Sequence, residues 1–466
     1  MKRFLDEDFC LKNETAKKLY HTYAENLPII DYHCHLDPKD IALDKVFGSL
    51  SELWLSGDHY KWRLMRADGA EEKYVTGDGD DNEKLRLWAK VLEKSIGNPL
   101  YHWSHMELKT YFDYEGILKG TNADMVMEHC KPYFESKQIS ARRLIEKSNV
   151  THICTTDDPV DDLKWHKKLC EDETFKTKVY PSWRPDKILN CEKDGFASYI
   201  KKLSEMSGVE ITSLDGLKTA IKLRIEYFAS LGTRTADHGL DYCFYAPCEE
   251  YEAQQIFERA LRGEAIAESD ALKYKSAMLL FMAEEYCKKD WVMQLHYGCS
   301  RNVNTQLFNT LGADTGIDCI NPINPSGSLA KLLDAFTSKS VLPKTVVYSL
   351  DPSENAAIDT IIGCFQGKGK GYVQHGAAWW FNDHKTGMEE HLKALAAGGV
   401  LGNFVGMLTD SRSFVSYTRH DYFRRIFCNL LGTWVEEGEY PNDEEALGKI
   451  IQDVCYNNAF EYFNLA

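Results

Sequence analysis

Short apolar runs recur along the chain and are separated by longer stretches whose apolar positions follow a helical period. The runs are continuous rather than alternating, which is typical of strands buried on both faces of a parallel sheet. We predict eight such strands, in Leu27–Asp37, Val150–Thr155, Lys178–Ser182, Ser230–His238, Trp291–His296, Val346–Leu350, Gly371–His375 and Val400–Thr409.

Helical patterns fill the segments between these strands. They predict a lead-in over residues 1–26, a mainly helical insertion over residues 37–149, and further helices at about Ala197–Phe228 and at Glu249–Lys289. Eight strand–helix units indicate an α/β fold: a distorted (β/α)8 TIM-like barrel that forms one domain over residues 1–466, with the insertion after its first strand. A doubly wound open sheet is the alternative, but no GxGxxG or Walker-type loop follows any predicted strand.

Composition and charge narrow the classes of function. The chain has 466 residues, 44% hydrophobic and 27% charged, which are values of a globular protein. Its formal net charge of −16 argues against a binder of nucleic acid or of an anionic membrane. A small anionic substrate stays compatible with that charge, because a few buried arginines set the local field. Its 14 scattered cysteines and an N-terminus without an apolar segment predict a cytoplasmic protein, and we expect a homo-oligomer.

The first predicted strand ends in a pair of histidines. Alternation along the strand places His33 and His35 on one face, about 7 Å apart. Asp410 ends the last predicted strand, which lies beside the first in a closed barrel. These three residues offer two nitrogens and one oxygen to a single divalent metal, a donor set suited to zinc or another divalent transition metal. From the residues alone, a hydrogen-bonded histidine pair remains the alternative.

Other polar residues follow the remaining predicted strands, and a barrel gathers all strand ends on one face. They are Asp157, Asp158, Arg184, Asp237, His238, His296, Arg301, Asp351, His375, Trp379, Trp380 and Arg412. For Asp157, Asp158 and Asp351, helix capping or a structural ion pair is the favoured interpretation.

A strand-one HxH with a strand-eight Asp looks like the amidohydrolase superfamily. Longer segments resemble the uronate isomerase family and span nearly the whole chain in that family's order: Gly57–Arg63 (GDHYKWR), Ser182–Lys187 (SWRPDK), Gln294–Asn304 (QLHYGCSRNVN), Asn321–Asp334, Gln374–Leu392 (QHGAAWWFNDHKTGMEEHL) and Gly406–Ile426 (GMLTDSRSFVSYTRHDYFRRI). The family interconverts D-glucuronate with D-fructuronate, and D-galacturonate with D-tagaturonate. The resemblance therefore implies a small-molecule hexuronate substrate. Val303 departs from the family's usual residue.

The resemblance places His59 and Tyr60 in the catalytic site, with Tyr60 as the proton shuttle. A phenol titrates near 10, so it needs a nearby cation, and Arg412 is our choice. Asp410 would both ligate the metal and take part in proton transfer or ring opening. An ordinary packed side chain is the alternative for Tyr60.

Substrate binding needs a fixed positive charge for the uronate carboxylate. Arg184 and Arg301, which follow buried strands, are our candidates for this charge, with surface ion pairs as the alternative. Trp380 or Trp379 would stack on the apolar face of the sugar, with simple packing of the adjacent pair as the alternative. His296 would contact the substrate or neighbour the metal.

The metal would polarise a carbonyl or hydroxyl oxygen, or it would be an inheritance from hydrolytic relatives, since isomerisation needs no activated water. A metal-dependent hydrolase is the second hypothesis. Against it, strand four offers no lysine and strand six no histidine for a second metal. The third hypothesis is a protein that binds sugar acids without catalysis. It leaves the titratable groups at the predicted strand ends unexplained, because binding alone does not need so many of them.

Overall fold

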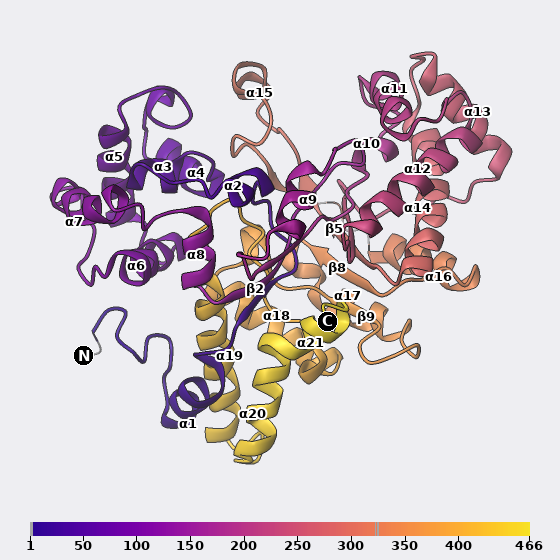
Figure 1. Ribbon diagram of the computed structural model, residues 1–466. Coiled ribbons are helices and arrows are strands. Elements are labelled where there is room, and N and C mark those ends of the chain that lie inside the picture. The colour runs from indigo at the N-terminus through magenta and orange to yellow at the C-terminus, as the bar shows by residue number, and fades with distance from the viewer. Residues whose placement is uncertain (1–2, 322, 324–325) are drawn as a thin grey trace.

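The computed structural model describes residues 3–321, 323 and 326–466. Two parallel sheets form its centre (Figure 1). One contains β1 (Ile29–Asp31), β2 (Val150–Cys154) and β3 (Lys178–Tyr180), in the order β1-β2-β3. The other has the order β4-β5-β8-β9, with β4 at Thr235–Gly239, β5 at Val292–Tyr297, β8 at Thr345–Ser349 and β9 at Val373–His375.

Trp183 connects the two sheets beyond the end of β3. Its amide donates to the carbonyl of Thr235 at 3.0 Å, and its carbonyl accepts from the amide of Asp237 at 2.8 Å. The predicted α/β fold with parallel strands is confirmed, and the arrangement is that of a distorted TIM-like barrel.

The predicted eighth strand is the main difference from the expected fold. Within Val400–Thr409, residues Leu401–Asn403 form a 3-10 turn and the remainder has no regular structure. Gly406 adopts a φ of +79°, which interrupts an extended chain. Side chains then take up the backbone carbonyls: Asn458 donates to Gly402 and Phe404, and Tyr32 donates to Gly406.

Two smaller corrections concern strand boundaries. The segment Ser230–His238 forms a strand only from Thr235, because helix α12 (Leu214–Ser230) continues through Ser230. A short antiparallel pair, β6 (Cys299–Ser300) and β7 (Cys319–Ile320), was not expected and follows β5.

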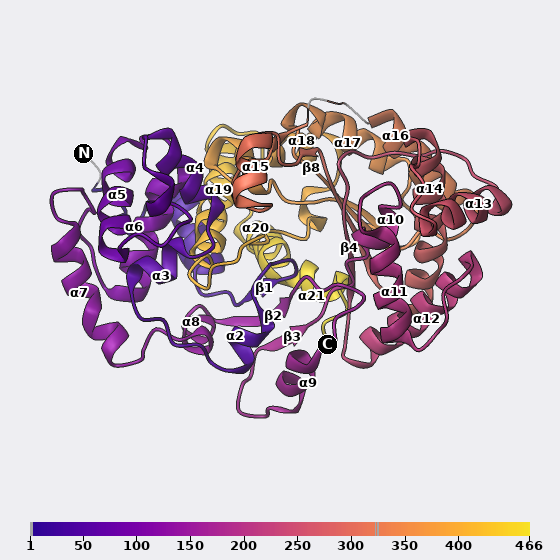
Figure 2. The same ribbon diagram turned by 90° about the horizontal axis from the view of Figure 1, so that it is seen from above.

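Helices occupy the chain between β1 and β2, on the indigo side of Figures 1 and 2. They are α2 (Pro38–Ala42), α3 (Leu50–Leu55), α4 (His59–Ala67), a 3-10 turn (Glu72–Tyr74), α5 (Asp81–Lys94), α6 (Pro99–Phe112), α7 (Ala123–Glu135) and α8 (Ala141–Lys147). Before β1, the chain forms α1 (Glu14–Leu19) and a π-helix (Tyr20–Ala24).

The remaining helices lie mainly on the opposite side and below the sheets (Figures 1 and 2). They are α9 (Lys164–Glu171), α10 (Asp186–Leu189), α11 (Phe196–Ser207), α13 (Glu250–Leu261), α14 (Glu268–Lys289), α15 (Thr305–Leu311), α16 (Ser326–Ser338), α17 (Asn355–Gly363), α18 (Lys385–Gly398), α19 (Thr418–Glu436), α20 (Glu444–Gln452) and α21 (Asn458–Tyr462), with 3-10 turns at Pro352–Glu354 and Trp380–Asn382 and a π-helix at Asp453–Asn457. The expected helix over 197–228 is two helices, α11 and α12, because Gly208 ends α11 with a φ of +70°.

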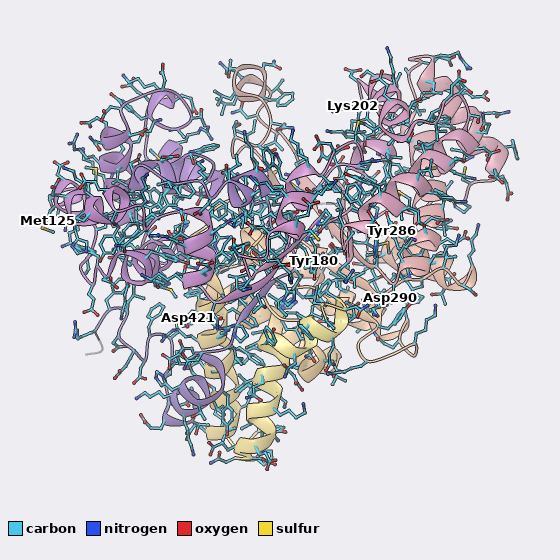
Figure 3. The ribbon with its side chains drawn as sticks, viewed as in Figure 1. Met125, Tyr180, Lys202, Tyr286, Asp290 and Asp421 are labelled. Carbon is cyan, nitrogen blue, oxygen red and sulfur yellow. The ribbon has the colours of Figure 1, made fainter. Side chains whose placement is uncertain are left out.

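Two apolar clusters fill the interior. One joins β1 and β2 to the insertion and to α19, and the other packs α11–α14 and α16 against β4 and β5. In Figure 3, Tyr286 lies within the second cluster, whereas Met125 on α7 points outward. No helix in the described residues is long and apolar enough to cross a membrane. The described residues exclude Met1 and Lys2. They also exclude three residues of the Asn321–Asp334 motif, which are Pro322, Asn324 and Pro325.

Candidate active site

Two adjoining pockets lie at the carboxyl ends of the strands and share His59, Asp410 and Arg412. The larger has a volume of about 560 Å³. Between them the pockets are lined by every residue with a predicted catalytic, substrate-binding or metal-ligating role: His33, His35, His59, Tyr60, Arg184, His296, Arg301, Trp380, Asp410 and Arg412, together with Trp379. The fold thus brings to one place residues that lie far apart in the sequence.

Backbone contacts hold the HxH segment against the loop that carries Asp410. The amide of Asp410 donates to the carbonyl of His33 at 3.2 Å, and the amide of His35 donates to the carbonyl of Ser411 at 2.9 Å. Asp410 itself has a φ of +47°, a left-handed conformation that is strained for a residue with a side chain. Its carboxylate then meets both imidazoles, with Oδ1 3.2 Å from His33 Nε2 and 3.0 Å from His35 Nε2.

The electrostatics of this group favour an ionised Asp410 carboxylate and a neutral His35. Burial acts to lower the pKa of His33, but the carboxylates of Asp237 and Asp410 raise it overall. Burial alone would raise the pKa of Asp410, but hydrogen bonds from His33 and His35 hold it well below its usual range. Burial lowers the pKa of His35 to about 4, so this imidazole is neutral at physiological pH. A neutral imidazole and a carboxylate are the forms that bind a divalent metal.

The other ring nitrogen of His33 faces a second carboxylate, that of Asp237 on β4. His33 Nδ1 lies 3.8 Å from Asp237 Oδ2, and His296 Nδ1 lies 2.6 Å from Asp237 Oδ1. Arg184 completes the group, with Nη1 3.0 Å from Asp237 Oδ2. Despite burial, these three neighbours hold the pKa of Asp237 well below its usual range.

Among the described residues, two sets of side chains have the proximity that a metal ion requires, and they share His33. One is His33, His35 and Asp410, and the other is His33, Asp237 and His296. The first set fits a divalent ion, because its carboxylate meets two imidazoles that can each give a ring nitrogen to the metal. In the second set the guanidinium of Arg184 already neutralises Asp237, which disfavours a second metal.

Tyr60 lies in the first turn of α4, which begins after Asp58 because the side chain of that N-cap residue accepts hydrogen bonds from the amides of Tyr60 and Lys61. Its hydroxyl donates to Asp383 Oδ2 at 3.2 Å. The cation against its ring is Arg419, with 5.1 Å between the guanidinium carbon and the ring centroid.

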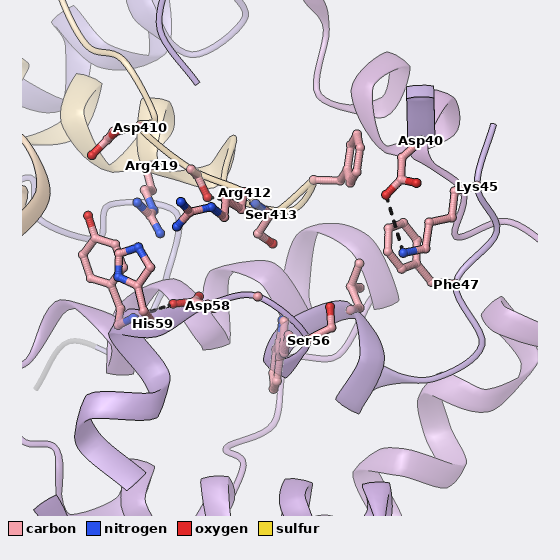
Figure 4. Close-up of a pocket in the computed structure, with 16 residues that line it drawn as sticks. Asp40, Lys45, Phe47, Ser56, Asp58, His59, Asp410, Arg412, Ser413 and Arg419 are labelled. Atoms are coloured by element: carbon pink, nitrogen blue, oxygen red, sulfur yellow. Dashed lines mark hydrogen bonds and ion pairs between the residues drawn. The ribbon is translucent and has the colours of Figure 1, made fainter. Parts of the chain in front are cut away.

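Arg412 has a different environment from the one we expected. It follows Asp410 on the exposed side of the loop and pairs with Asp314 at 3.4 Å. After burial, its charge is the main factor that lowers the pKa of His59. The guanidinium that packs on the Tyr60 ring is that of Arg419, which α19 carries into the same pocket, and the role of Arg412 stays a prediction. Figure 4 shows Asp410, Arg412 and Arg419 facing His59 and Asp58 across it.

Arg301 and Trp380 line the larger pocket together. The guanidinium carbon of Arg301 lies 5.0 Å from the ring centroid of Trp380, and Arg301 Nη1 lies 2.8 Å from Asp318 Oδ2. Trp380 has a φ of +48°, another strained position next to the site. The neighbouring Trp379 is tied to the strand layer, since its indole donates to the carbonyl of Ser349.

Sequence reasoning assigned no role to Asp383 or Arg419, and it left Asp237 as a strand-end residue without a function. Asp383 and Arg419 lie within two of the family-like segments, and both are charged residues among aromatic ones. A charged residue among aromatic residues was the available signal for a buried ion pair, because a charged side chain is buried only if it is paired.

Comparisons with known proteins agree with this geometry. The family model described as glucuronate isomerase matches residues 1–463. A uronate isomerase of Endomicrobium trichonymphae is 55% identical over 99% of this chain and 99% of its own length. The chain belongs to the glucuronate isomerase family.

Further relatives extend this assignment. A uronate isomerase of Lachnoclostridium phytofermentans is 53% identical over 99% of this chain and 100% of its own length. Among solved structures, uronate isomerase from Thermotoga maritima superposes with a TM-score of 0.94 at 34% identity, covering 99% of this chain and 100% of that one. Glucuronate isomerase from Caulobacter crescentus gives 0.92 at 25% identity, covering 99% and 97%. The isomerase resemblance inferred from the sequence motifs is confirmed.

Proposed function

We propose that this family member interconverts D-glucuronate and D-fructuronate, and D-galacturonate and D-tagaturonate, in hexuronate catabolism in the cytoplasm. The observation that carries the proposal is the sequence identity with uronate isomerases: 55% and 53% of the residues are identical in alignments that cover 99% of this chain. The pocket chemistry supports it, because acids, bases and guanidinium groups surround one cavity of a size that accommodates a hexose acid.

The reaction moves one proton between neighbouring carbons. The sugar ring opens, a proton leaves C2, and one is returned to C1, with an enediol between the two steps. Such a reaction needs a base near C2, an acid for the carbonyl oxygen and positive charge for the oxygen that becomes negative. Tyr60, His59 and Asp410 are our candidates for the proton transfers, with Arg412 as the nearby charge.

Binding would use other side chains that line the larger pocket. We assign the uronate carboxylate and the hydroxyl groups to Arg184 and Arg301, since a planar guanidinium binds a carboxylate through two hydrogen bonds. Trp380 offers an aromatic face for the sugar, and His296 lies close enough to His33 to contact a substrate bound there.

His33, His35 and Asp410 would hold one divalent ion, which we propose is zinc. Two imidazole nitrogens and one carboxylate oxygen are the donors that zinc accepts while keeping a position open. When bound, such an ion supplies a Lewis acid that polarises a carbonyl or hydroxyl oxygen.

The test is an incubation of the zinc-supplied protein with D-glucuronate, and separately with D-galacturonate, in D2O, followed by proton NMR. We expect the corresponding ketose, with deuterium at C1 if the moving proton exchanges with solvent. Ketose without deuterium would retain the isomerase and indicate a shielded proton or a hydride shift. No ketose from either uronate would contradict the proposed function.

A further inference from the structure

Asp383 and Arg419 contact Tyr60 but have no part in the roles assigned above. They come from separate elements: Asp383 follows the 3-10 turn Trp380–Asn382, and Arg419 lies in the first turn of α19. Both are buried, each with 2% of its surface exposed. A buried ion pair is weak evidence for a gain in stability, because both groups lose their hydration. Their position against a candidate proton shuttle therefore points to function.

The geometry links the three side chains through one oxygen atom. Asp383 Oδ2 accepts the Tyr60 hydroxyl at 3.2 Å and lies 3.4 Å from Arg419 Nη1. The guanidinium of Arg419 packs on the Trp103 ring at 4.2 Å and donates to the carbonyl of Thr409 at 3.2 Å, next to Asp410. Arg419 thus fixes Asp383 and Tyr60 relative to the loop that carries Asp410.

The electrostatics keep Tyr60 in its neutral form. Burial, and then the charge of Asp383, raise the pKa of Tyr60 well above its usual range. The Tyr60 hydroxyl is therefore protonated at neutral pH in the substrate-free protein. Burial raises the pKa of Asp383 to about 7, although Arg419 and the hydrogen bond from Tyr60 act in the opposite direction. A carboxyl with that pKa can both accept and release a proton near neutral pH.

Other charged groups surround this pair. Asp58 and Lys61 form a buried ion pair of their own in the first turn of α4, and Glu107 on α6 is close enough for its charge to act on Arg419. Of these neighbouring carboxylates, it is that of Asp383 that accepts the hydrogen bond from the Tyr60 hydroxyl.

We propose that Asp383, held by Arg419, is the positioning residue through which Tyr60 exchanges protons with the substrate. The inference rests on the proposed isomerase function and deepens it: it states where the phenolic proton goes. A neutral phenol can take up a proton only if it gives up its own at the same time, and Asp383 Oδ2 is the acceptor within reach.

The proton transfer conserves both charge and atoms. The phenol oxygen takes a proton from the substrate while the phenolic proton moves along the hydrogen bond to Asp383 Oδ2. The electron pair of the broken substrate bond stays with the substrate, which gains one negative charge, and the carboxylate of Asp383 becomes a neutral carboxyl. The reverse movement returns a proton to the neighbouring position, and Tyr60 is neutral before and after.

The experiment compares D383N, Y60F and Y60F/D383N in the full-length, zinc-supplied protein. The amide introduced by D383N keeps the size of the side chain and a hydrogen-bond acceptor but cannot take a proton. We expect each single variant to lower kcat by about 100-fold with KM within about threefold of the parent. The double variant should be no slower than the slower single variant, because both changes remove the same path.

D157N is the matched control. Asp157 is also a buried carboxyl whose pKa burial raises to about 7, but its hydroxyl partner is Thr155 and it lines neither pocket. We expect its kcat to stay within about threefold of the parent. If Arg419 without its counterion prevents folding, D383N/R419Q removes both charges together and carries the same expectation.

The outcomes separate this inference from the proposed function. A parent protein that forms no ketose contradicts the function itself. Two results with an active parent protein would leave the function standing but overturn the role of Asp383. One is a D383N variant with the parental kcat. The other is a double variant whose loss of kcat equals the product of the two single losses.

Discussion

At the residue scale, His33 is the side chain on which the site depends, because its two ring nitrogens face different carboxylates. Nε2 lies 3.2 Å from Asp410 and Nδ1 lies 3.8 Å from Asp237. The ring therefore belongs to both possible sets of metal ligands. The two sets differ in the other ligands, which are His35 and Asp410 in one set and His296 and Asp237 in the other.

This gives a prediction for metal content. H35Q should lose most of its bound zinc, whereas H296Q should retain it, because Arg184 already neutralises the carboxylate of the second set. The measurement is the zinc-to-protein ratio after dialysis, by atomic emission. Retention in H35Q together with loss in H296Q would assign the ion to His33, Asp237 and His296 instead.

Glu107 on α6 provides a second prediction at this scale, on stability. It is 2% exposed, and burial raises its pKa from 4.5 to about 7, against the opposing charges of Lys61 and Arg419. Because the folded-state pKa is above the unfolded one, its contribution to stability is fully present below about pH 4.5 and is lost as the pH rises through about 7.

E107Q removes this dependence. Relative to the parent, the variant should gain unfolding free energy between about pH 5 and about pH 8, by up to about 3 kcal/mol for a pKa difference of this size. Urea unfolding of both proteins at the two pH values measures it. A difference that is the same at both pH values would show that Glu107 ionises normally in the folded state.

At the element scale, the loop before Asp410 replaces a regular strand, and Gly406 is its critical position. A Cβ at Gly406 would lie 2.2 Å from the carbonyl oxygen of Val454, and the φ of +79° adds strain. We expect G406A to lower the unfolding free energy by about 2 kcal/mol or more and to weaken metal binding through Asp410.

G438A is the control for backbone strain alone. Gly438 has a similar φ of +75°, but nothing in the described residues lies within 4 Å of an added Cβ. Its expected cost is about 1 kcal/mol, with unchanged metal content. Denaturant unfolding and metal analysis of both variants test the comparison, and equal effects would refute the steric role of Val454.

The same loop shows what sequence patterns can and cannot give. The strands β2, β5 and β8 were recognisable because each is a short, largely apolar run, which the fold buries almost completely. The 400–409 run is equally apolar, yet its carbonyls are taken by the side chains of Asn458 and Tyr32. Such tertiary contacts override a local preference for a strand, and they cannot be predicted from the local sequence.

The site residues divide in the same way. His33, His35 and Asp410 could be named because metal ligands follow a spacing and strand ends converge in a barrel. Asp383 and Arg419 could not be given a role, because their pairing depends on how α19 packs beneath Tyr60. The role of Arg412 as a charge near Tyr60 stays a prediction, and the sequence could not show that the guanidinium of Arg419 packs on the Tyr60 ring.

At the scale of the whole molecule, the proposed metal site ties together the two ends of the chain. His33 and Asp410 are separated by 377 positions, and their donor atoms meet only in the folded protein. The ion therefore binds the native state in preference to the unfolded one, and its binding free energy adds to stability.

Zinc should accordingly raise the melting temperature of the metal-free protein, with a gain of about 2.7 kcal/mol at a concentration about 100 times the Kd. D410N should show little of this shift, because it removes the ligand that joins the C-terminal loop to β1. H296Q should keep it, since His296 lies outside the proposed metal site of His33, His35 and Asp410. Differential scanning calorimetry with and without zinc measures all three proteins. An undiminished shift in D410N would place the stabilising ion elsewhere and separate stability from the site at the strand ends.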